Sequence, residues 1–178
     1  MKTNKTQIKS NLKSQIAEYP NFPKEGITFK DLNPIYQNKE SFKQLINYTA
    51  DLASSVGNID YICGIEARGF ILGAGLAQKL DCGFIPMRKK GKLPGQVESI
   101  EYDLEYGTDI LEIQNQDQLK NSRVLIIDDV FATGGTLKAA INLLKKQASY
   151  VACGIVMDIG IADIKSIDCD HFVILDDA

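Results

Sequence analysis

A single histidine is present among the 178 residues of this chain. It is His171, which stands between Asp170 and Phe172 with no serine or cysteine nucleophile motif beside it. A hydrolase built on a Ser–His–Asp or Cys–His arrangement is therefore disfavoured, and so is a zinc centre that relies on histidine ligands. We expect His171 to be a residue at the edge of a strand.

Cysteine is also scarce, and its spacing suits neither a metal site nor a disulfide framework. The cysteines stand at positions 63, 82, 153 and 169, with no CxxC pair and no spacing typical of zinc ligands. Cys63 and Cys153 lie within apolar stretches, so we expect them to be small core residues. This pattern fits a reducing compartment.

Long apolar runs and targeting segments are lacking as well. No run approaches the ~20 apolar residues of a membrane span, and the basic residues 1–13 lack the apolar segment of a signal peptide. We therefore expect a cytoplasmic protein that has no membrane partner. The net charge of −3 argues against nucleic acid as a partner, although the stretch RKKGK (88–92) concentrates four positive charges.

The periodicity of apolar residues predicts helices first and then an alternation of strands and helices. Residues 5–18 predict a short amphipathic helix, residues 19–35 with three prolines predict an irregular arm, and residues 41–55 predict a helix with Ser41 as its N-cap. Further strands are predicted at 60–66, 83–89, 123–130, 150–159 and 171–177, and helices at 69–80 and 135–146. The alternation predicts an α/β fold with a parallel, twisted sheet flanked by helices.

One long segment, between residues 87 and 110, interrupts this alternation. It has no helical period, and a connection of this length in a compact domain is typical of a functional lid. Polar and apolar residues alternate along QVESIEYDLEYGTDILEIQ (96–114), which favours two antiparallel strands. We therefore expect residues 88–107 to form a flexible loop that includes part of an antiparallel ribbon.

The strongest chemical signal is VLIIDDVFATGGTL at residues 124–137. An aliphatic strand ends on Asp128 and Asp129, and small and hydroxyl-bearing residues then lead into a helix. Free N–H groups at a helix N-terminus bind phosphate, whereas adjacent carboxylates repel it and must meet another part of the ligand. Since carboxylates accept hydrogen bonds from sugar hydroxyls, the stretch predicts a site for a ribose 5-phosphate.

Other interpretations of this stretch are weaker. The two aspartates could serve only to cap the next helix, but capping requires one such residue. Neither GxxxxGK[ST] nor GxGxxG occurs in the chain, so an ATP-binding loop and a dinucleotide fold are both unsupported.

The stretch 124–137 resembles the phosphoribosyl-diphosphate (PRPP) signature of the type I phosphoribosyltransferases. FPKEGITFKDLNPI (22–35), GIEARGF (64–70) and RKKGKLPG with YDLEYGTDILEI (88–113) also resemble, in order and spacing, the adenine phosphoribosyltransferase family. The resemblance implies one domain over residues 1–178, with an N-terminal helix and base-binding arm at 1–35. It also implies transfer of the 5-phosphoribosyl group from PRPP to adenine, giving AMP and diphosphate.

For PRPP, the resemblance implies that Asp128 and Asp129 hold the ribose hydroxyls. The implied cradle of the 5-phosphate consists of Ala132, Thr133, Gly134, Gly135 and Thr136. The residues implied to meet the diphosphate are Arg68, Arg88, Lys89 and Lys92. Glu66 and Ala67, joined by a cis peptide, are implied to belong to the PRPP site. Lys90 is not fixed by the family pattern, and a solvated side chain is the competing interpretation. Mg²⁺ is expected to arrive with PRPP, and a homodimer is expected because the arginine of this run can reach a partner subunit.

For adenine, the resemblance implies a sandwich between Phe29 and Val130, with the backbone of Thr28 bonding the base edge. A plain core position remains an equally open interpretation of Phe29. Glu105 matches the general acid near adenine N7, although Glu101 and Asp103 cannot be distinguished from it without the resemblance. Lys30 stands where the family has arginine. A lysine cannot make the bidentate contact of an arginine at this position near Glu105.

Two alternative functions remain open. A phosphoribosyltransferase for xanthine or orotate would keep residues 128–136 and differ at Phe29, Glu105 and the arm 22–35. Enzymes for hypoxanthine and guanine carry an aspartate where this chain has Ala132, and are disfavoured. A regulator that senses PRPP needs a DNA-binding domain, and the residues before the arm are too few for a helix-turn-helix module.

Overall fold

The computed structural model describes residues 5–103, 107–115 and 117–175. The chain divides into two compact units, Met1–Tyr48 and Thr49–Ala178. We call them the N-terminal unit and the main unit and describe each by itself. None of the helices in these described ranges is both long and apolar enough to cross a membrane.

The N-terminal unit contains a β-hairpin between short helices. Its elements are α1 (Lys5–Lys13), β1 (Ala17–Pro20), β2 (Thr28–Asp31), α2 (Asn33–Gln37) and the first part of α3 (Lys39–Ala53). Strands β1 and β2 pair antiparallel, and the turn between them holds a cis bond before Pro23. The prediction of an irregular arm over residues 19–35 was therefore wrong. Proline obscured the hairpin, since it is tolerated at an edge-strand end and in the connecting turn.

Two helix boundaries in this unit also differ from the sequence prediction. Helix α1 ends at Lys13 rather than at residue 18, because the following residues turn into β1. The side chain of Asn38, not Ser41, caps α3, since its Oδ1 accepts from the N–H groups of Glu40 and Ser41 at 3.1 Å. Ser41 is buried inside the helix and donates its hydroxyl to Gln15 Oε1 at 2.7 Å.

The main unit is built on a sheet whose strand order is β5-β6-β4-β3-β7-β8-β9 among the described residues. The strands are β3 (Tyr61–Ile65), β4 (Gly83–Lys89), β5 (Val97–Asp103), β6 (Thr108–Gln114), β7 (Arg123–Phe131), β8 (Tyr150–Asp158) and β9 (Asp170–Val173). Strands β4, β3, β7, β8 and β9 run parallel, whereas β6 pairs antiparallel with both β4 and β5. The parallel sheet and the antiparallel ribbon that the sequence predicted are both confirmed.

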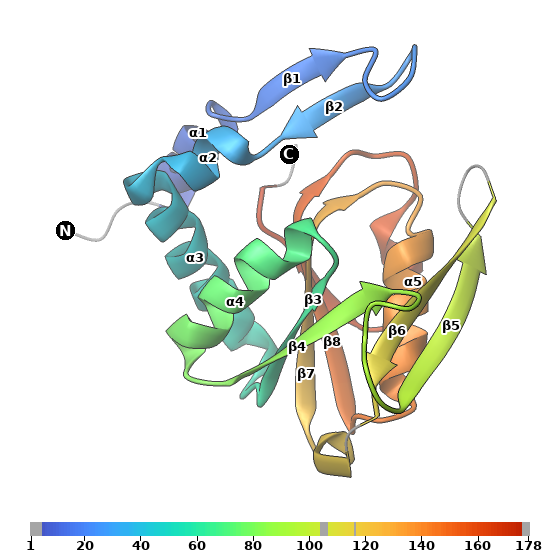
Figure 1. The fold of residues 1–178 in the computed structure, drawn as a ribbon. Helices are drawn as coiled ribbons and strands as arrows, with labels where there is room; N and C mark the ends of the chain where they lie inside the picture. Colours follow the sequence, from blue (N-terminus) through green and yellow to red (C-terminus); the bar gives the residue numbers. More distant parts are fainter. Residues whose placement is uncertain (1–4, 104–106, 116, 176–178) are drawn as a thin grey trace. The chain divides into compact units, whose positions relative to one another are not determined.

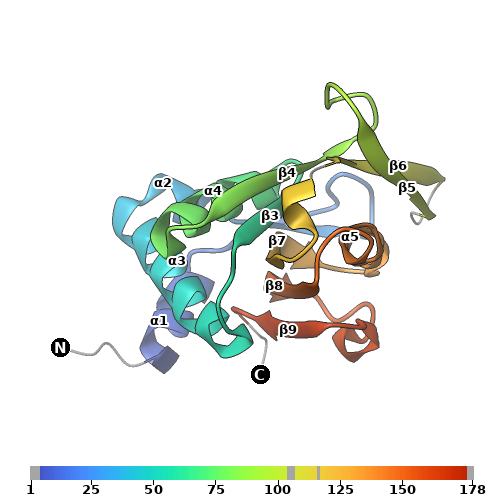
Figure 2. The same cartoon turned by 90° about the horizontal axis from the view of Figure 1, so that it is seen from below.

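Helices cover both faces of this sheet. Helix α4 (Arg68–Leu80) contacts β3, β7 and β4, and α5 (Gly135–Lys145) contacts β5, β7 and β8. Figures 1 and 2 show α4 and α5 on opposite sides of the strands. Short 3₁₀ turns complete the connections, at Ser54–Val56, Asp117–Leu119 and Ile164–Ser166. This double cover explains why residues 124–127 of β7 are entirely buried aliphatic residues.

The predicted positions of the single histidine, at a strand edge, and of two cysteines, in the core, are confirmed. His171 lies in the edge strand β9, where its Nδ1 is 3.0 Å from the carbonyl oxygen of Cys169. Cys63 and Cys153 have no exposed surface. Strand β9 ends at Val173, earlier than predicted from the sequence.

Helix α5 packs its apolar face into the core of the main unit, and this packing holds the N-terminus of the helix in place. Leu143 belongs to the core and has no exposed surface, while the next residue toward the N-terminus, Asn142, is exposed. We expect Leu143→Ala to lower the free energy of unfolding by about 2–5 kcal/mol, since it removes buried methyl groups and leaves a cavity. Asn142→Ala, the matched control on the same helix, should change it by less than about 0.5 kcal/mol. Urea unfolding monitored by circular dichroism measures both, and a loss below about 1 kcal/mol for Leu143→Ala would contradict this packing.

Candidate active site

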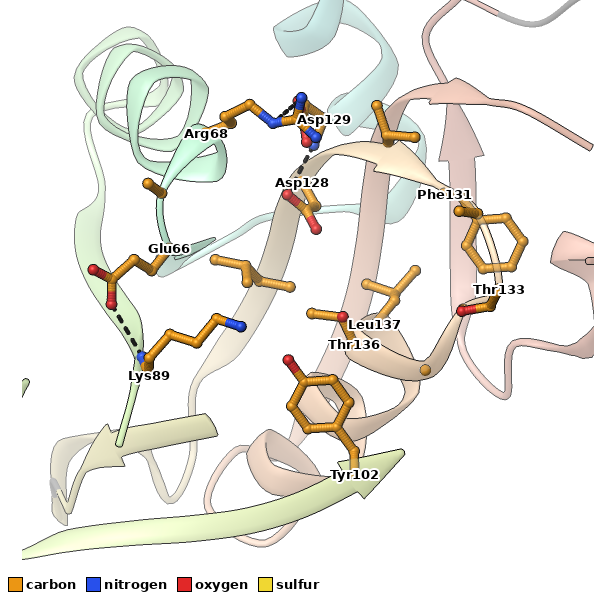
Figure 3. Close-up of a pocket in the computed structure, with 16 residues that line it drawn as sticks. Glu66, Arg68, Lys89, Tyr102, Asp128, Asp129, Phe131, Thr133, Thr136 and Leu137 are labelled. Carbon is orange, nitrogen blue, oxygen red and sulfur yellow. Dashed lines mark hydrogen bonds and ion pairs between the residues drawn. The ribbon is translucent and has the colours of Figure 1, made fainter. Parts of the chain in front are cut away.

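A cavity of about 230 Å³ lies at the carboxyl ends of β3, β4 and β7 and at the start of α5. Figure 3 shows the side chains around it. Ligands of open α/β sheets collect at this edge because the strand ends and helix N-termini meet there. The lining residues are Ile65, Glu66, Ala67, Arg68, Lys89, Tyr102, Asp128, Asp129, Val130, Phe131, Ala132, Thr133, Gly134, Gly135, Thr136 and Leu137.

The acidic pair stands at the end of β7. Asp129 is buried and forms an ion pair with Arg68, whose Nε lies 2.6 Å from Asp129 Oδ2. The backbone N–H of Asp129 donates to Asp128 Oδ1 at 2.9 Å. Burial, together with the charge of Asp129, raises the pKa of Asp128 well above the usual aspartate value. Burial also raises the pKa of Asp129, although Arg68 acts in the opposite direction.

Arg68 reaches this pair because the start of α4 approaches the end of β7 closely. A Cβ at Gly69 would lie 2.6 Å from the carbonyl oxygen of Ile127, so only glycine permits this approach. Arg68, the first residue of α4, then points its side chain at Asp129 across the cavity wall (Figure 3). The peptide bond between Glu66 and Ala67, just before α4, is cis, as the resemblance implied.

The turn between β7 and α5 is shaped to present backbone N–H groups. Gly134 has φ +81°, in the left-handed region, and a Cβ there would come within 2.8 Å of the Phe131 ring. Helix α5 begins at the next residue, and its first intrahelical bond runs from Lys138 N–H to Gly134 O at 2.9 Å. The N–H groups of the first turn have no acceptor within the helix and stand beside the hydroxyls of Thr133 and Thr136. This geometry suits a phosphate.

Glu66 organises the end of β4 on the other side of the cavity. Its carboxylate accepts from Arg88 Nη2 at 2.9 Å and Nε at 3.2 Å, and from the N–H of Lys89 at 3.0 Å. These bonds, led by those from Arg88, hold the pKa of Glu66 below its usual value. Arg88 also donates to the carbonyl oxygen of Lys92 at 3.2 Å, which ties it to the exposed loop that follows β4.

Lys89 extends from β4 into the cavity. Its ammonium forms an ion pair with Asp109 on β6, and Tyr102 on β5, which stands opposite Asp109 in the strand register, lines the same cavity. Burial alone lowers the pKa of Lys89, but the hydrogen bond that its ammonium donates to Asp109 leads a set of favourable contacts that raise it overall. The cavity therefore carries cations on the side of Arg68 and Lys89, and the N–H groups of a helix N-terminus on the side of α5.

The structure brings together most of the residues predicted to bind PRPP. The predicted residues that line the cavity are Glu66, Ala67, Arg68, Lys89, Asp128, Asp129, Val130, Ala132, Thr133, Gly134, Gly135 and Thr136. Arg88 and Lys92 are not among the lining residues, because Arg88 turns its side chain to Glu66 and Lys92 is exposed. Glu105 lies outside the described residues.

The predicted adenine-binding residues of the arm lie on β2 in the N-terminal unit. Phe29 is partly exposed and meets the Phe22 ring edge-on at 5.3 Å between centroids, so the core interpretation of Phe29 is not supported. Thr28 is exposed. Lys30 forms an ion pair with Glu18, its partner in the β1–β2 register.

Sequence reasoning missed several residues that line the cavity. Tyr102 is the most polar of them, and Ile65, Phe131 and Leu137 complete the apolar part of the wall. A signal for Tyr102 was present, since it stands in the alternating pattern of the ribbon on the same face as Ile100. The pattern alone does not say which face of the ribbon meets the cavity.

Comparison with known proteins supports one family throughout. Residues 31–177 match the model of the phosphoribosyl transferase domain. The adenine phosphoribosyltransferase of Brachyspira hyodysenteriae is 51% identical over 140 residues, which is 79% of this chain and 82% of that protein. The adenine phosphoribosyltransferase of Trichormus variabilis is 46% identical over 151 residues, covering 84% of this chain and 88% of the relative.

Solved structures agree with these sequence relatives. Adenine phosphoribosyltransferase from Saccharomyces cerevisiae, complexed with an imino-altritol bisphosphate and adenine, superposes with a TM-score of 0.90 at 38% identity, over 96% of this chain and 99% of that chain. The enzyme from Rhodothermus marinus gives a TM-score of 0.87 at 39% identity, with the same coverage. The chain therefore belongs to the phosphoribosyltransferase family and, within it, to the adenine phosphoribosyltransferases.

Proposed function

We propose that this chain transfers the 5-phosphoribosyl group of PRPP to adenine, giving AMP and diphosphate, a reaction of purine salvage. Its relatives are named for this activity and cover most of its length. The observation that carries the proposal is one cavity that joins an acidic pair to a helix N-terminus with a glycine and threonine turn. A ribose 5-phosphate has the complementary groups, hydroxyls at one end and a phosphate at the other.

The proposed reaction is a displacement at C1 of the ribose. The bond from C1 to the diphosphate oxygen breaks and its electron pair leaves with the diphosphate, while a bond forms from C1 to N9 of adenine, which loses its proton. Charge accumulates on the leaving group, so the protein contributes by positioning the reactants and stabilising that charge. Arg68 and Lys89, on the wall of the cavity, would supply this stabilisation.

The ribose and its phosphate would bind at opposite sides of the cavity. Asp128 and Asp129 would accept hydrogen bonds from the ribose hydroxyls, and the turn from Ala132 to Thr136 would donate to the 5-phosphate. Asp128 is half-buried beside the buried Asp129, and desolvation together with that neighbouring charge raises its pKa, so donors such as ribose hydroxyls would stabilise its charged form. Arg88 and Lys92 are proposed to reach the diphosphate only after a rearrangement of the loop that follows β4.

For the base, the proposal follows the residues that the resemblance assigns to adenine. Val130 would contact one face of adenine and Phe29 the other, which buries both faces of the purine. The backbone of Thr28 would bond the base edge, and Glu105 would act as the general acid near N7. Lys30 would keep a positive charge at the family arginine position but without its planar fork.

The donor set of the cavity is compatible with Mg²⁺ bound together with PRPP. Asp128 offers carboxylate oxygen, the ligand type that Mg²⁺ prefers. Within residues 5–103, 107–115 and 117–175, no group of three or more histidine, cysteine, aspartate or glutamate side chains could hold a metal. The diphosphate and water would therefore provide most of the ligands. The bound metal would neutralise part of the charge on the leaving group.

Assembly and location belong to the same proposal. We expect a homodimer in the cytoplasm, because the resemblance at residues 88–92 includes an arginine that can reach a partner subunit. The net charge of −3 supports the expectation that nucleic acid is not a partner. Sedimentation equilibrium of the full chain tests the dimer, which a monomer at all concentrations would exclude.

A panel of bases tests the proposed activity directly. The full chain is incubated with Mg²⁺-PRPP and, separately, adenine, hypoxanthine, guanine, xanthine, orotate or uracil, and nucleotide and diphosphate are measured. We expect AMP from adenine and at least about hundredfold lower turnover of the other bases, since a site built to bond one base edge leaves polar groups unpaired with another. Efficient turnover of xanthine or orotate would keep the PRPP site and refute the adenine assignment. Binding of PRPP without turnover would favour the regulator.

The raised pKa of Asp128 predicts a trade-off between activity and stability. Because the folded-state pKa is raised, the native chain binds more protons than the unfolded chain at pH values between the usual aspartate pKa and the raised one. The free energy of unfolding therefore falls as pH rises through this window. Asp128→Asn removes this loss, and the variant should become more stable than the wild type as pH increases from 4 to 8. Its kcat/KM for PRPP should fall by about 10- to 100-fold, because an amide accepts weaker hydrogen bonds than a carboxylate.

Urea unfolding across this pH range, with AMP synthesis in parallel, measures both effects. Asp168→Asn is the control, since Asp168 is exposed and its pKa is lowered, chiefly by the hydrogen bond from Lys145. The control should leave AMP synthesis unchanged. It should be slightly less stable than the wild type at neutral pH, whereas Asp128→Asn should be more stable. A stability difference between Asp128→Asn and wild type that stays constant with pH would refute the assignment.

A further inference from the structure

Strands β4, β5 and β6 direct three side chains toward one point on the cavity wall. In the antiparallel register, Tyr102 of β5 stands opposite Asp109 of β6, and Lys89 of β4 stands opposite Leu111 of β6. Because side chains alternate along a strand, Asp109 and Leu111 lie on one face of β6. Lys89, Tyr102 and Asp109 therefore share a face, and two of them line the cavity.

The contacts within this group fix the position of the ammonium. Lys89 Nζ forms an ion pair with Asp109 Oδ2, and the other carboxylate oxygen of Asp109 accepts from the N–H of Ile110 at 2.8 Å. Tyr102 is only 8% exposed, and it favours the charged forms of both Lys89 and Asp109, since it raises the pKa of the lysine and lowers that of the aspartate. Figure 3 shows Lys89 and Tyr102 among the side chains that surround the cavity. We call Lys89, Tyr102 and Asp109 the lysine clamp.

The clamp leaves part of the ammonium available to a ligand. A lysine ammonium has three N–H donors, and the ion pair with Asp109 engages one of them. The side chain remains 43% exposed, on the side of the cavity. Lysine is a flexible side chain that loses much rotamer freedom when a ligand immobilises it. A lysine that is already held loses less of that freedom when the ligand binds.

We propose that Asp109 is a positioning residue for PRPP binding, which with Tyr102 holds the Lys89 ammonium so that a remaining donor meets the diphosphate. The inference rests on the proposed function, since it takes the diphosphate of PRPP as the partner of Lys89. Asp109 acts through Lys89 and makes no contact with substrate. Its own charge repels the diphosphate, but the ammonium stands between the two and lies nearer to both.

A double-mutant cycle on Asp109 and Lys89 tests the proposal. The proteins are wild type, Asp109→Asn, Lys89→Met and the double variant, with KM for PRPP and kcat measured in AMP synthesis and the Kd of Mg²⁺-PRPP measured by calorimetry. We expect Asp109→Asn to raise KM and Kd about five- to tenfold, the effect of immobilising one long side chain, with kcat changed less than about twofold. In the Lys89→Met background, the same substitution should change KM by less than about twofold.

Conservative and distant variants separate positioning from damage to the fold. Asp109→Glu keeps the carboxylate and should restore most of the PRPP affinity, while Tyr102→Phe removes one hydroxyl and should raise KM by about twofold to threefold. Asp117→Asn, at a surface ion pair with Lys120, is the control and should leave KM and kcat unchanged. Thermal unfolding of every variant monitors the fold.

Two results would overturn the proposal. An unchanged or lowered KM for Asp109→Asn would mean that the carboxylate only competes with the diphosphate. An equal rise of KM in the Lys89→Met background would mean that Asp109 acts on the fold and not through Lys89. If the wild type binds Mg²⁺-PRPP but makes no AMP, the proposed reaction has failed, and the Kd values alone still decide whether the clamp exists.

Discussion

The ion pair between Arg68 and Asp129 is the contact on which the arrangement of the cavity depends. It joins the first residue of α4 to the end of β7, with 2.6 Å between Arg68 Nε and Asp129 Oδ2. Asp129 is only 3% exposed, so loss of Arg68 would leave a buried charge without its partner, which is strongly destabilising. The close approach at Gly69 makes the contact possible. The same pair fixes one wall of the cavity and the orientation of one carboxylate.

Three cations at or near the cavity are held by carboxylates of the same chain. Arg68 pairs with Asp129, Arg88 with Glu66 and Lys89 with Asp109. A concentration of positive charge without such partners would repel itself and destabilise the folded state. In the proposed reaction, an incoming diphosphate would therefore meet guanidinium and ammonium groups whose positions are already restricted. Arg88 differs from the others, because it must leave Glu66 or share it to reach a ligand in the cavity.

The sequence predicted the framework of the main unit and most of the residues that line its cavity, for a physical reason. Burial on both faces requires continuous aliphatic residues in β7. The acid pair and the glycine turn follow in the same stretch, so one local pattern indicates both the strand and the residues at its end. The hairpin at β1 and β2 was missed because its prolines are typical of irregular segments. The cap of α3 was misplaced by three residues, since Asn38 and Ser41 are both good cap residues and only the backbone distinguishes them.

What the sequence by itself determined is the alternation of strands and helices, the acid pair at a strand end, and the glycine and threonine turn at a helix start. These features are local, because each arises from residues within about one turn or one strand of each other. Only the tertiary structure decided that Tyr102, Lys89 and Asp109 meet at one ammonium and that Arg88 turns to Glu66. Such partners come from different strands, and the register between strands, which no local pattern specifies, determines which side chains face each other.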